Sequence, residues 1–350
     1  MSRAASRSSR RGVPPVTRVP LEVLIGEFGA SRSPFLIWLG LLGVGVLALG
    51  AAMVPIGPDW LDGAGAVVVA TAYAWGLAAR TGGRPLVFGL LTLVCALGAV
   101  ISDQDLLLTG AAVSTAALAS VFGIMLTVPA AGFLTAAREC GIALACAGVG
   151  AMAAIGFEPA IQKERFEYVG LGLAFAGAMV LVYRLGAGFH GLGRRGLVAV
   201  AIGASTLAVS LLYAEMLRRY GSSGLVEELL DLVRWSRDTL GAFPRPIEAI
   251  LGVPALAYGC HIRARRRQGW WVCAFGVAAT APAATALANP AVTFTEAFLS
   301  IVYGLLIGLA IGWVLIRLDL ALTGNRGRRS RVAEQAAAVR PEPARFAPLL

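Results

Sequence analysis

The sequence predicts an all-α fold, a polytopic integral membrane bundle of about ten transmembrane helices. Hydrophobic residues make up 57% of the 350 residues, charged residues only 14%, and the mean hydropathy is +0.75. A soluble domain carries about a quarter charged residues. Because the apolar residues gather in long runs, we expect the chain to be solvated mostly by lipid.

Recurring apolar runs define the predicted spans. Backbone groups in hydrocarbon have no water partner, so each lipid-exposed run is expected to be helical. The two shortest runs leave the number of spans at ten to within one. The runs cover residues 35–54, 64–79, 86–101, 106–134, 140–157, 168–189, 197–216, 247–262, 270–288 and 295–316.

The distribution of charge predicts the orientation. With both termini in the cytosol, most of the 30 basic residues fall in cytosolic loops and tails, while acidic residues predominate outside. This spread over short loops argues against nucleic-acid binding despite the net charge of +10. Lys163 is the only lysine, a bias typical of GC-rich bacterial genomes. We therefore predict a multi-pass protein of the bacterial cytoplasmic (inner) membrane, with the lipid bilayer as its main partner.

This topology divides the chain into four regions. Residues 1–33 form a disordered basic N-terminal tail, and residues 34–167 hold membrane helices one to five. Residues 168–317 hold helices six to ten, with an outer amphipathic helix at 224–240. Residues 318–350 form a basic cytosolic C-terminal tail.

The outer segment 217–246 has two interpretations. At helical spacing its leucines and valines share one face and its charged residues the other, which is typical of a helix lying on the outer leaflet. Alternatively it is a lid or a binding site for an anionic lipid headgroup, because guanidinium groups suit phosphate. The arginines available for a headgroup are Arg218, Arg219, Arg237 and Arg245.

A ten-residue string, Phe-Gly-x-x-x-Thr-x-Pro-Ala-Ala, occurs at Phe122–Ala131 and again at Phe275–Ala284. A proline inside a helix frees the carbonyl one turn earlier. Paired breaks in corresponding places of two halves are typical of a transporter's binding site. Alternatively, both prolines only kink packed helices. The predicted substrate-binding residues are Thr127, Pro129, Thr280, Pro282, Thr285 and Asn289.

Two further coincidences favour an internal repeat. Arg84-Pro85 and Arg245-Pro246 precede corresponding spans, and Glu139 and Glu296 precede the fifth and tenth spans. Five helices per unit make the two units inverted repeats. Length, span count and this inversion are similar to the architecture of the drug/metabolite transporter superfamily, although no signature of that superfamily identifies particular residues here.

Other signals are structural. Gly304, Gly308 and Gly312 form a stripe suited to close helix packing, either inside the chain or in a homo- or hetero-oligomer. Charged residues, Glu248 among them, fall near span ends, which argues against proton coupling through a deep carboxylate. We expect no cofactor, no metal site and no catalytic residue.

These observations favour a transporter of a small neutral or lipid-like substrate. One alternative is a polyprenyl-linked glycan enzyme or flippase that uses the outer arginines. The other is a noncatalytic membrane scaffold. An enzyme is the less expected class.

Overall fold

A computed structural model describes residues 32–54, 57–160, 163–185, 193–220, 223–265, 269–289, 292–323 and 342–349. Within these ranges every regular element is a helix. The predicted basic N-terminal tail lies outside them except for its last two residues, and so does most of the C-terminal tail.

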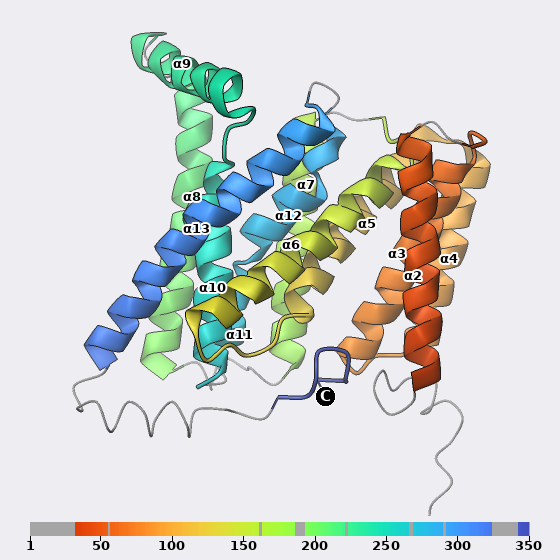
Figure 1. Cartoon of the computed structure of the whole chain (residues 1–350), viewed down its shortest axis with the longest axis horizontal. Helices are drawn as coiled ribbons and strands as arrows, with labels where there is room; N and C mark the ends of the chain where they lie inside the picture. Colours follow the sequence, from red (N-terminus) through yellow and green to blue (C-terminus); the bar gives the residue numbers. More distant parts are fainter. Residues whose placement is uncertain are drawn as a thin grey trace, which may run out of the picture.

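The helices follow the predicted order, and each of the ten predicted runs overlaps at least one helix (Figure 1). Their bounds are α2 (Arg32–Met53), α3 (Leu61–Arg80), α4 (Pro85–Ser102), α5 (Asp105–Met125), α6 (Phe133–Ile155), α7 (Lys163–Arg184), α8 (Gly193–Tyr220), α9 (Ser223–Leu240), the π-helix η2 (Glu248–Gly252), α10 (Val253–Arg263), α11 (Gly269–Ala274), α12 (Val277–Ala284), the 3-10 helix η3 (Ala286–Ala288) and α13 (Phe294–Thr323).

In the described ranges, eight helical segments are long and apolar enough to cross a membrane. The chain is therefore a multi-pass membrane protein. Two predicted spans fall short of those criteria: α8, whose apolar part covers Ala201–Ser210, and the 16 residues from η2 to the end of α10. The count of ten stays a prediction.

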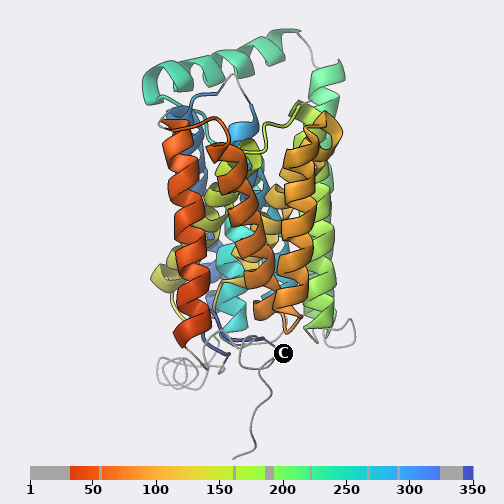
Figure 2. The same ribbon diagram turned by 90° about the vertical axis from the view of Figure 1, so that its right-hand side faces the viewer.

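The bundle has a buried centre and an apolar periphery. More than half of the residues are buried in α3, α5, α6 and the α11–α12 segment, but fewer than a third in α2, α4, α7 and α13. Figure 2 shows α2 and α4 on the outside of the bundle. Their outward side chains are large and apolar, for example Leu47 at 74% and Ile101 at 80% exposure. Such a surface is stable only when lipid covers it.

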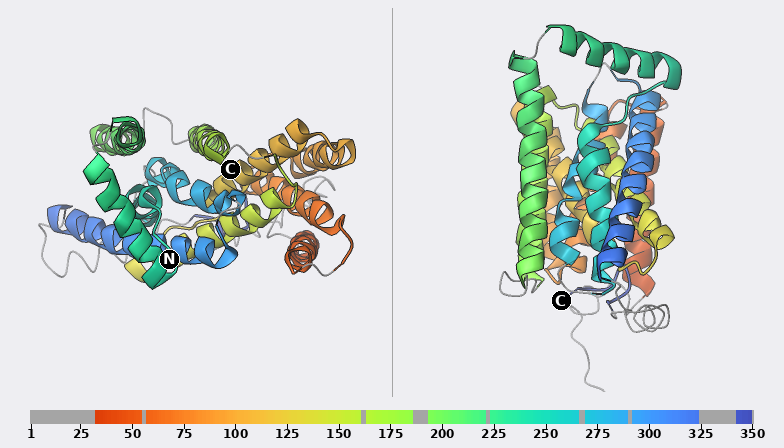
Figure 3. Two further views of the ribbon diagram at one scale, coloured as in Figure 1. Left: turned by 90° about the horizontal axis from the view of Figure 1, so that it is seen from above. Right: turned by 90° about the vertical axis from the view of Figure 1, so that its left-hand side faces the viewer.

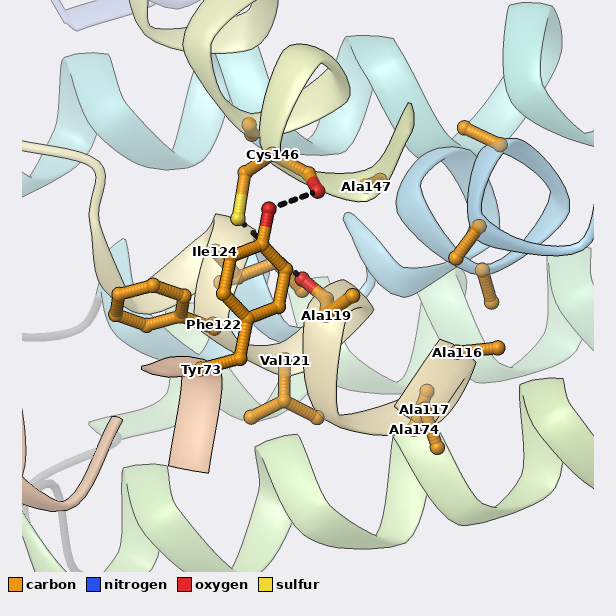
Figure 4. Close-up of a cluster of buried hydrophobic side chains, with 14 of the residues drawn as sticks. Tyr73, Ala116, Ala117, Ala119, Val121, Phe122, Ile124, Cys146, Ala147 and Ala174 are labelled. Carbon is orange, nitrogen blue, oxygen red and sulfur yellow. Dashed lines mark hydrogen bonds between the residues drawn. The ribbon is translucent and has the colours of Figure 1, made fainter. Parts of the chain in front are cut away.

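Small residues let the central helices approach closely. Most of the buried core is alanine, and at Gly252 an added Cβ would lie 2.1 Å from the backbone nitrogen of Ala279 on α12. Around Phe122 the core is aromatic: its ring centroid lies 5.2 Å from that of Tyr73. Tyr73 donates its hydroxyl to the Cys146 carbonyl at 2.8 Å, as Figure 4 shows.

The residues expected to form an amphipathic helix, 224–240, lie in α9 (Ser223–Leu240). This helix lies across one end of the bundle, over α8 and α13 (Figure 3). On its surface Arg234 pairs with Asp231 at 2.7 Å. We call this end the α9 end, and the opposite end, where the C-terminal segment lies, the tail end (Figure 1).

Two predicted boundaries are wrong. Helix α5 ends at Met125, not at residue 134, and α6 begins at Phe133, not at 140. Pro129 explains why α5 ends early. In a continuous helix the Pro129 ring would clash with the Met125 carbonyl, and the residue before a proline is biased away from helix. Pro129 therefore lies in the α5–α6 connection and kinks no helix, and Glu139 lies inside α6 and not before it.

The glycine stripe packs inside the chain. Gly304 lies against Glu248, Gly308 against Val253 and Gly312 against Ala257, so α13 presses on η2 and α10. An oligomer built on this stripe stays a prediction, and so does the inverted repeat.

Candidate functional site

The α9 end contains a pocket of about 320 Å³ between α7, α9, α12, α13 and the connection before η2. It brings together polar groups from segments far apart in the sequence. Its polar and proline-rich lining comprises Glu167, Tyr168, Arg237, Pro244, Arg245, Pro246, Pro282, Thr285, Asn289, Glu296 and Ser300. A concave site with a few convergent polar groups is the usual form of a ligand pocket.

Helix α9 is fixed over this pocket by polar contacts at its end. Arg237 Nε lies 3.0 Å from Glu296 Oε1 in the first turn of α13. The backbone N–H of Glu296 donates to Thr293 Oγ1 at 3.1 Å, which caps that helix. Ser236 donates to the Ala242 carbonyl at 2.7 Å, where the chain turns back toward the bundle. The lid-like position of α9 therefore rests on α13.

Arg245 is the half-buried cation of the pocket wall. Its Nη1 donates to the Pro282 carbonyl at 2.6 Å, which places the guanidinium beside the second copy of the string. Burial lowers the pKa of Arg245, while the carboxylates of Glu167 and Glu248 act in the opposite direction. An arginine stays charged in a protein, so the pocket holds a fixed positive charge.

Threonines complete the wall on the α12 side. Thr285 is buried and donates Oγ1 to the Ala281 carbonyl at 3.1 Å. One turn deeper, Thr280 Oγ1 shares a hydrogen bond of 2.7 Å with Ser120 Oγ, which ties α12 to α5. Thr280 is therefore part of the packed core and does not line the pocket.

An apolar groove of about 360 Å³ lies along a neighbouring face of α13, between α6, η3 and α13. Ala297 lines both the groove and the polar pocket. The groove is lined by alanine, glycine and larger apolar side chains, and Phe294 and Phe298 at its edge are 58% and 57% exposed. Its lining suits a hydrocarbon chain.

The structure divides the predicted site residues among three places. Pro282, Thr285 and Asn289 meet Arg237 and Arg245 in the pocket, so residues from two competing hypotheses share one site. Thr127 lies elsewhere, at the tail end, where it accepts a hydrogen bond of 2.7 Å from Arg263, and Pro129 follows it in the α5–α6 connection. Thr280 lies in the core. The side chains of Arg218 and Arg219 lie outside the described residues.

Sequence reasoning missed four buried charges. Arg80, Glu139, Glu248 and Arg263 are each at most 1% exposed, which their predicted places near span ends did not indicate. Neither carboxylate oxygen of Glu248 has a hydrogen-bond partner in the described structure, and the side chain packs against Gly304. Their positions relative to the apolar runs could have indicated this burial. Arg80, Glu139 and Arg263 directly adjoin an apolar run, and Glu248 lies within one.

Comparisons with family models, with curated proteins and with solved structures found no match to this chain. The architectural similarity to the drug/metabolite transporters therefore stays a prediction. The chain is a multi-pass membrane protein whose candidate site must be read from its own residues.

Proposed function

We propose that this membrane protein binds a lipid-like amphiphile with an anionic headgroup at its α9 end and moves it across the bilayer. One observation carries the proposal: the polar pocket and the apolar groove adjoin at Ala297. An amphiphile needs one compartment of each kind, side by side. A small neutral solute would have no use for the groove.

The headgroup would sit against Arg245. A guanidinium already held by the Pro282 carbonyl keeps further N–H groups for a phosphate or carboxylate, and its planar geometry suits either anion. Thr285 and Asn289 would contribute neutral polar contacts. Arg237 is paired with Glu296, so it would guide the headgroup at the rim and Arg245 would hold it.

Helix α9 would act as a lid. Its apolar face includes Val233, which lines the pocket, while Leu232 and Trp235 are half exposed and suit the membrane interface. Opening would require two contacts between α9 and α13 to part: the Arg237–Glu296 pair and the hydrogen bond of 2.8 Å from the Tyr303 hydroxyl to the Leu240 carbonyl. Because Arg237 is 54% exposed, that pair is worth about 1 kcal/mol or less.

The test measures binding and flipping of a fluorescent phosphatidic acid by the full-length protein reconstituted in phosphatidylcholine vesicles. We expect Arg245→Gln to lower both strongly, because it removes the guanidinium that lines the pocket beside Pro282. Arg234→Gln is the matched control, since Arg234 lies on α9 but pairs with Asp231 away from the pocket.

Equal binding by wild type and a folded Arg245→Gln protein would refute the headgroup site. Binding without any flipping would leave an amphiphile-binding protein and exclude transport. A neutral diacylglycerol probe separates headgroup recognition from partitioning into the groove, because the groove alone would not distinguish the two lipids.

A further inference from the structure

The C-terminal segment 342–349 inserts into the tail end of the bundle and ties together helices from both halves of the chain. Phe346 packs at a tilt against two aromatic side chains of α2, with ring centroids 4.8 Å from Phe35 and 5.7 Å from Trp38. The backbone N–H of Leu349 donates to the Arg80 carbonyl at 2.9 Å. The segment therefore packs on the bundle in a defined position, whereas the sequence predicted only a basic tail here.

Charge matches the segment to its site. Arg345 forms a two-pronged ion pair with Glu139, with contacts of 2.7 and 2.9 Å. In the opposite sense, Glu342 Oε2 accepts from Arg263 Nη2 at 2.7 Å. Both partners on the bundle are fully buried. Such reciprocal pairs specify one docked position.

Beneath the segment, two buried arginines are held by the end of the first copy of the string. Arg80 Nε donates to the Met125 carbonyl at 3.0 Å, and Arg263 donates to both Thr127 Oγ1 and the Thr127 carbonyl, at 2.7 and 3.0 Å. The Arg263 guanidinium also lies 3.4 Å above the Trp270 ring centroid. These contacts orient both cations in advance of any anion.

Glu342 satisfies this pair of cations incompletely. Its Oε1, Arg80 Nη2 and Arg263 Nε are all buried without a hydrogen-bond partner in the described structure. A carboxylate offers two oxygens on one plane, whereas a phosphate group presents at least three oxygens in a tetrahedral arrangement. Arg80 Nη1 donates to two neutral carbonyl oxygens of the segment, those of Ala344 and Ala347, and in the described structure no carboxylate of the segment hydrogen-bonds to Arg80.

We propose that Arg80 and Arg263 form a binding site for a phosphate group at the tail end, and that Glu342 occupies this site as a tethered competitor. Phosphate binding then displaces residues 342–349, and their return closes the site. The proposal does not depend on the α9-end pocket, because it uses different residues at the opposite end of the bundle. The phosphate could belong to a free anion or to a lipid headgroup, and the experiment separates these sources.

The test uses the full-length chain in phosphatidylcholine nanodiscs. Glu342→Ala should bind inorganic phosphate about tenfold more tightly than wild type, because the carboxylate that competes for Arg263 is gone. Pro348→Ala is the control, since it changes the same segment and keeps Glu342. Arg263→Gln or Arg80→Gln, added to Glu342→Ala, should abolish the gain.

A fluorophore at the C-terminus, in a Cys95→Ala background because Cys95 is exposed, reports release of the segment. Release by inorganic phosphate identifies a free anion as ligand, and release only in nanodiscs with phosphatidic acid identifies a headgroup. If neither releases the segment and Glu342→Ala, with a normal size-exclusion profile, binds phosphate no better than wild type, the segment is only structural and the proposal is overturned.

Discussion

The two copies of Phe-Gly-x-x-x-Thr-x-Pro-Ala-Ala are alike in spelling and different in structure. In the first, Phe122 and Gly123 lie in the last turn of α5, and Thr127 and Pro129 follow the helix end. In the second, Phe275 and Gly276 form the break between α11 and α12, and Pro282 lies inside α12. The same residues end one helix and continue another.

Their partners explain the difference. At the first copy, the carbonyls of Met125, Leu126 and Thr127 each accept from an arginine, so leaving the helix costs no hydrogen bond. At the second, the Pro282 carbonyl is the one that accepts from an arginine, Arg245, among the residues that the structure describes. Pro282 is the sixth of the eight residues of α12, so it removes one helical hydrogen bond, the bond to the Ala278 carbonyl. Arginines supplied by distant segments decide what the string becomes.

The first and largest way to break this comparison is Glu139→Ala. Glu139 accepts from Arg345 and also from the backbone N–H of Val128, within the first copy, at 3.0 Å. Removing a buried carboxylate leaves the arginine uncompensated and should lower the unfolding free energy by about 3–5 kcal/mol. Denaturant unfolding in micelles measures this loss.

Arg138→Ala is its matched control. Arg138 also pairs with Glu139, at 3.0 Å, but it is 61% exposed. We expect a loss of about 1 kcal/mol or less. Similar losses in both variants would mean that the burial of Glu139 does not control the end of α5.

The prolines should give opposite signs. Pro282→Ala restores an N–H inside α12 and should stabilise the protein by about 2 kcal/mol, because proline is unfavourable in a helix interior. Pro129→Ala gains no helical bond and loosens the unfolded chain, so it should destabilise by about 0.4–1 kcal/mol. Thermal midpoints of the two variants test this, and a shared sign would show that the copies are structurally equivalent after all.

The threonines should differ less. Thr127→Val removes a hydrogen bond to the buried Arg263 guanidinium, whereas Thr280→Val removes a neutral one to Ser120. Bonds to charged groups are the stronger, so the first substitution should cost about 1 kcal/mol more. Denaturation midpoints of the two variants measure these losses. A larger loss for Thr280→Val than for Thr127→Val would contradict the prediction, because the hydrogen bond in the core would then be the stronger one.

The sequence was sufficient for what depends on local pattern. Apolar runs predicted helices in the right order, and the period of leucines and charges predicted α9 nearly to its ends. It predicted five of the pocket residues, but in two separate hypotheses, because the contact of Arg245 with Pro282 joins positions 37 residues apart. The site at the tail end was missed, since Glu139 meets Arg345 across 206 residues. Phe346 and Leu349, apolar residues that follow an arginine-rich stretch, were the signal that could have pointed to docking.

The two ends of the bundle also differ in charge: two carboxylates, Glu158 and Asp62, meet at the α9 end, whereas arginines gather at the tail end. The stability of the α9 end should therefore depend on pH, and this is the smallest effect that we expect. At the α9 end, a hydrogen bond with Asp62 and the negative charge of that residue raise the pKa of Glu158, in the α6–α7 connection. A raised pKa means that the folded state favours the proton.

The stabilisation from this proton is full below the ordinary pKa of glutamate and is lost as pH rises through the raised value. Because Glu158 is largely exposed, solvent screening keeps the loss below about 1 kcal/mol. Thermal midpoints between pH 4 and 8 should therefore fall slightly for wild type relative to Glu158→Gln, which cannot ionise. Glu228→Gln, an exposed site on α9, controls for net charge. If the thermal midpoint of wild type instead fell below that of Glu158→Gln as the pH is lowered, the Asp62 carboxylate would not be raising the pKa of Glu158.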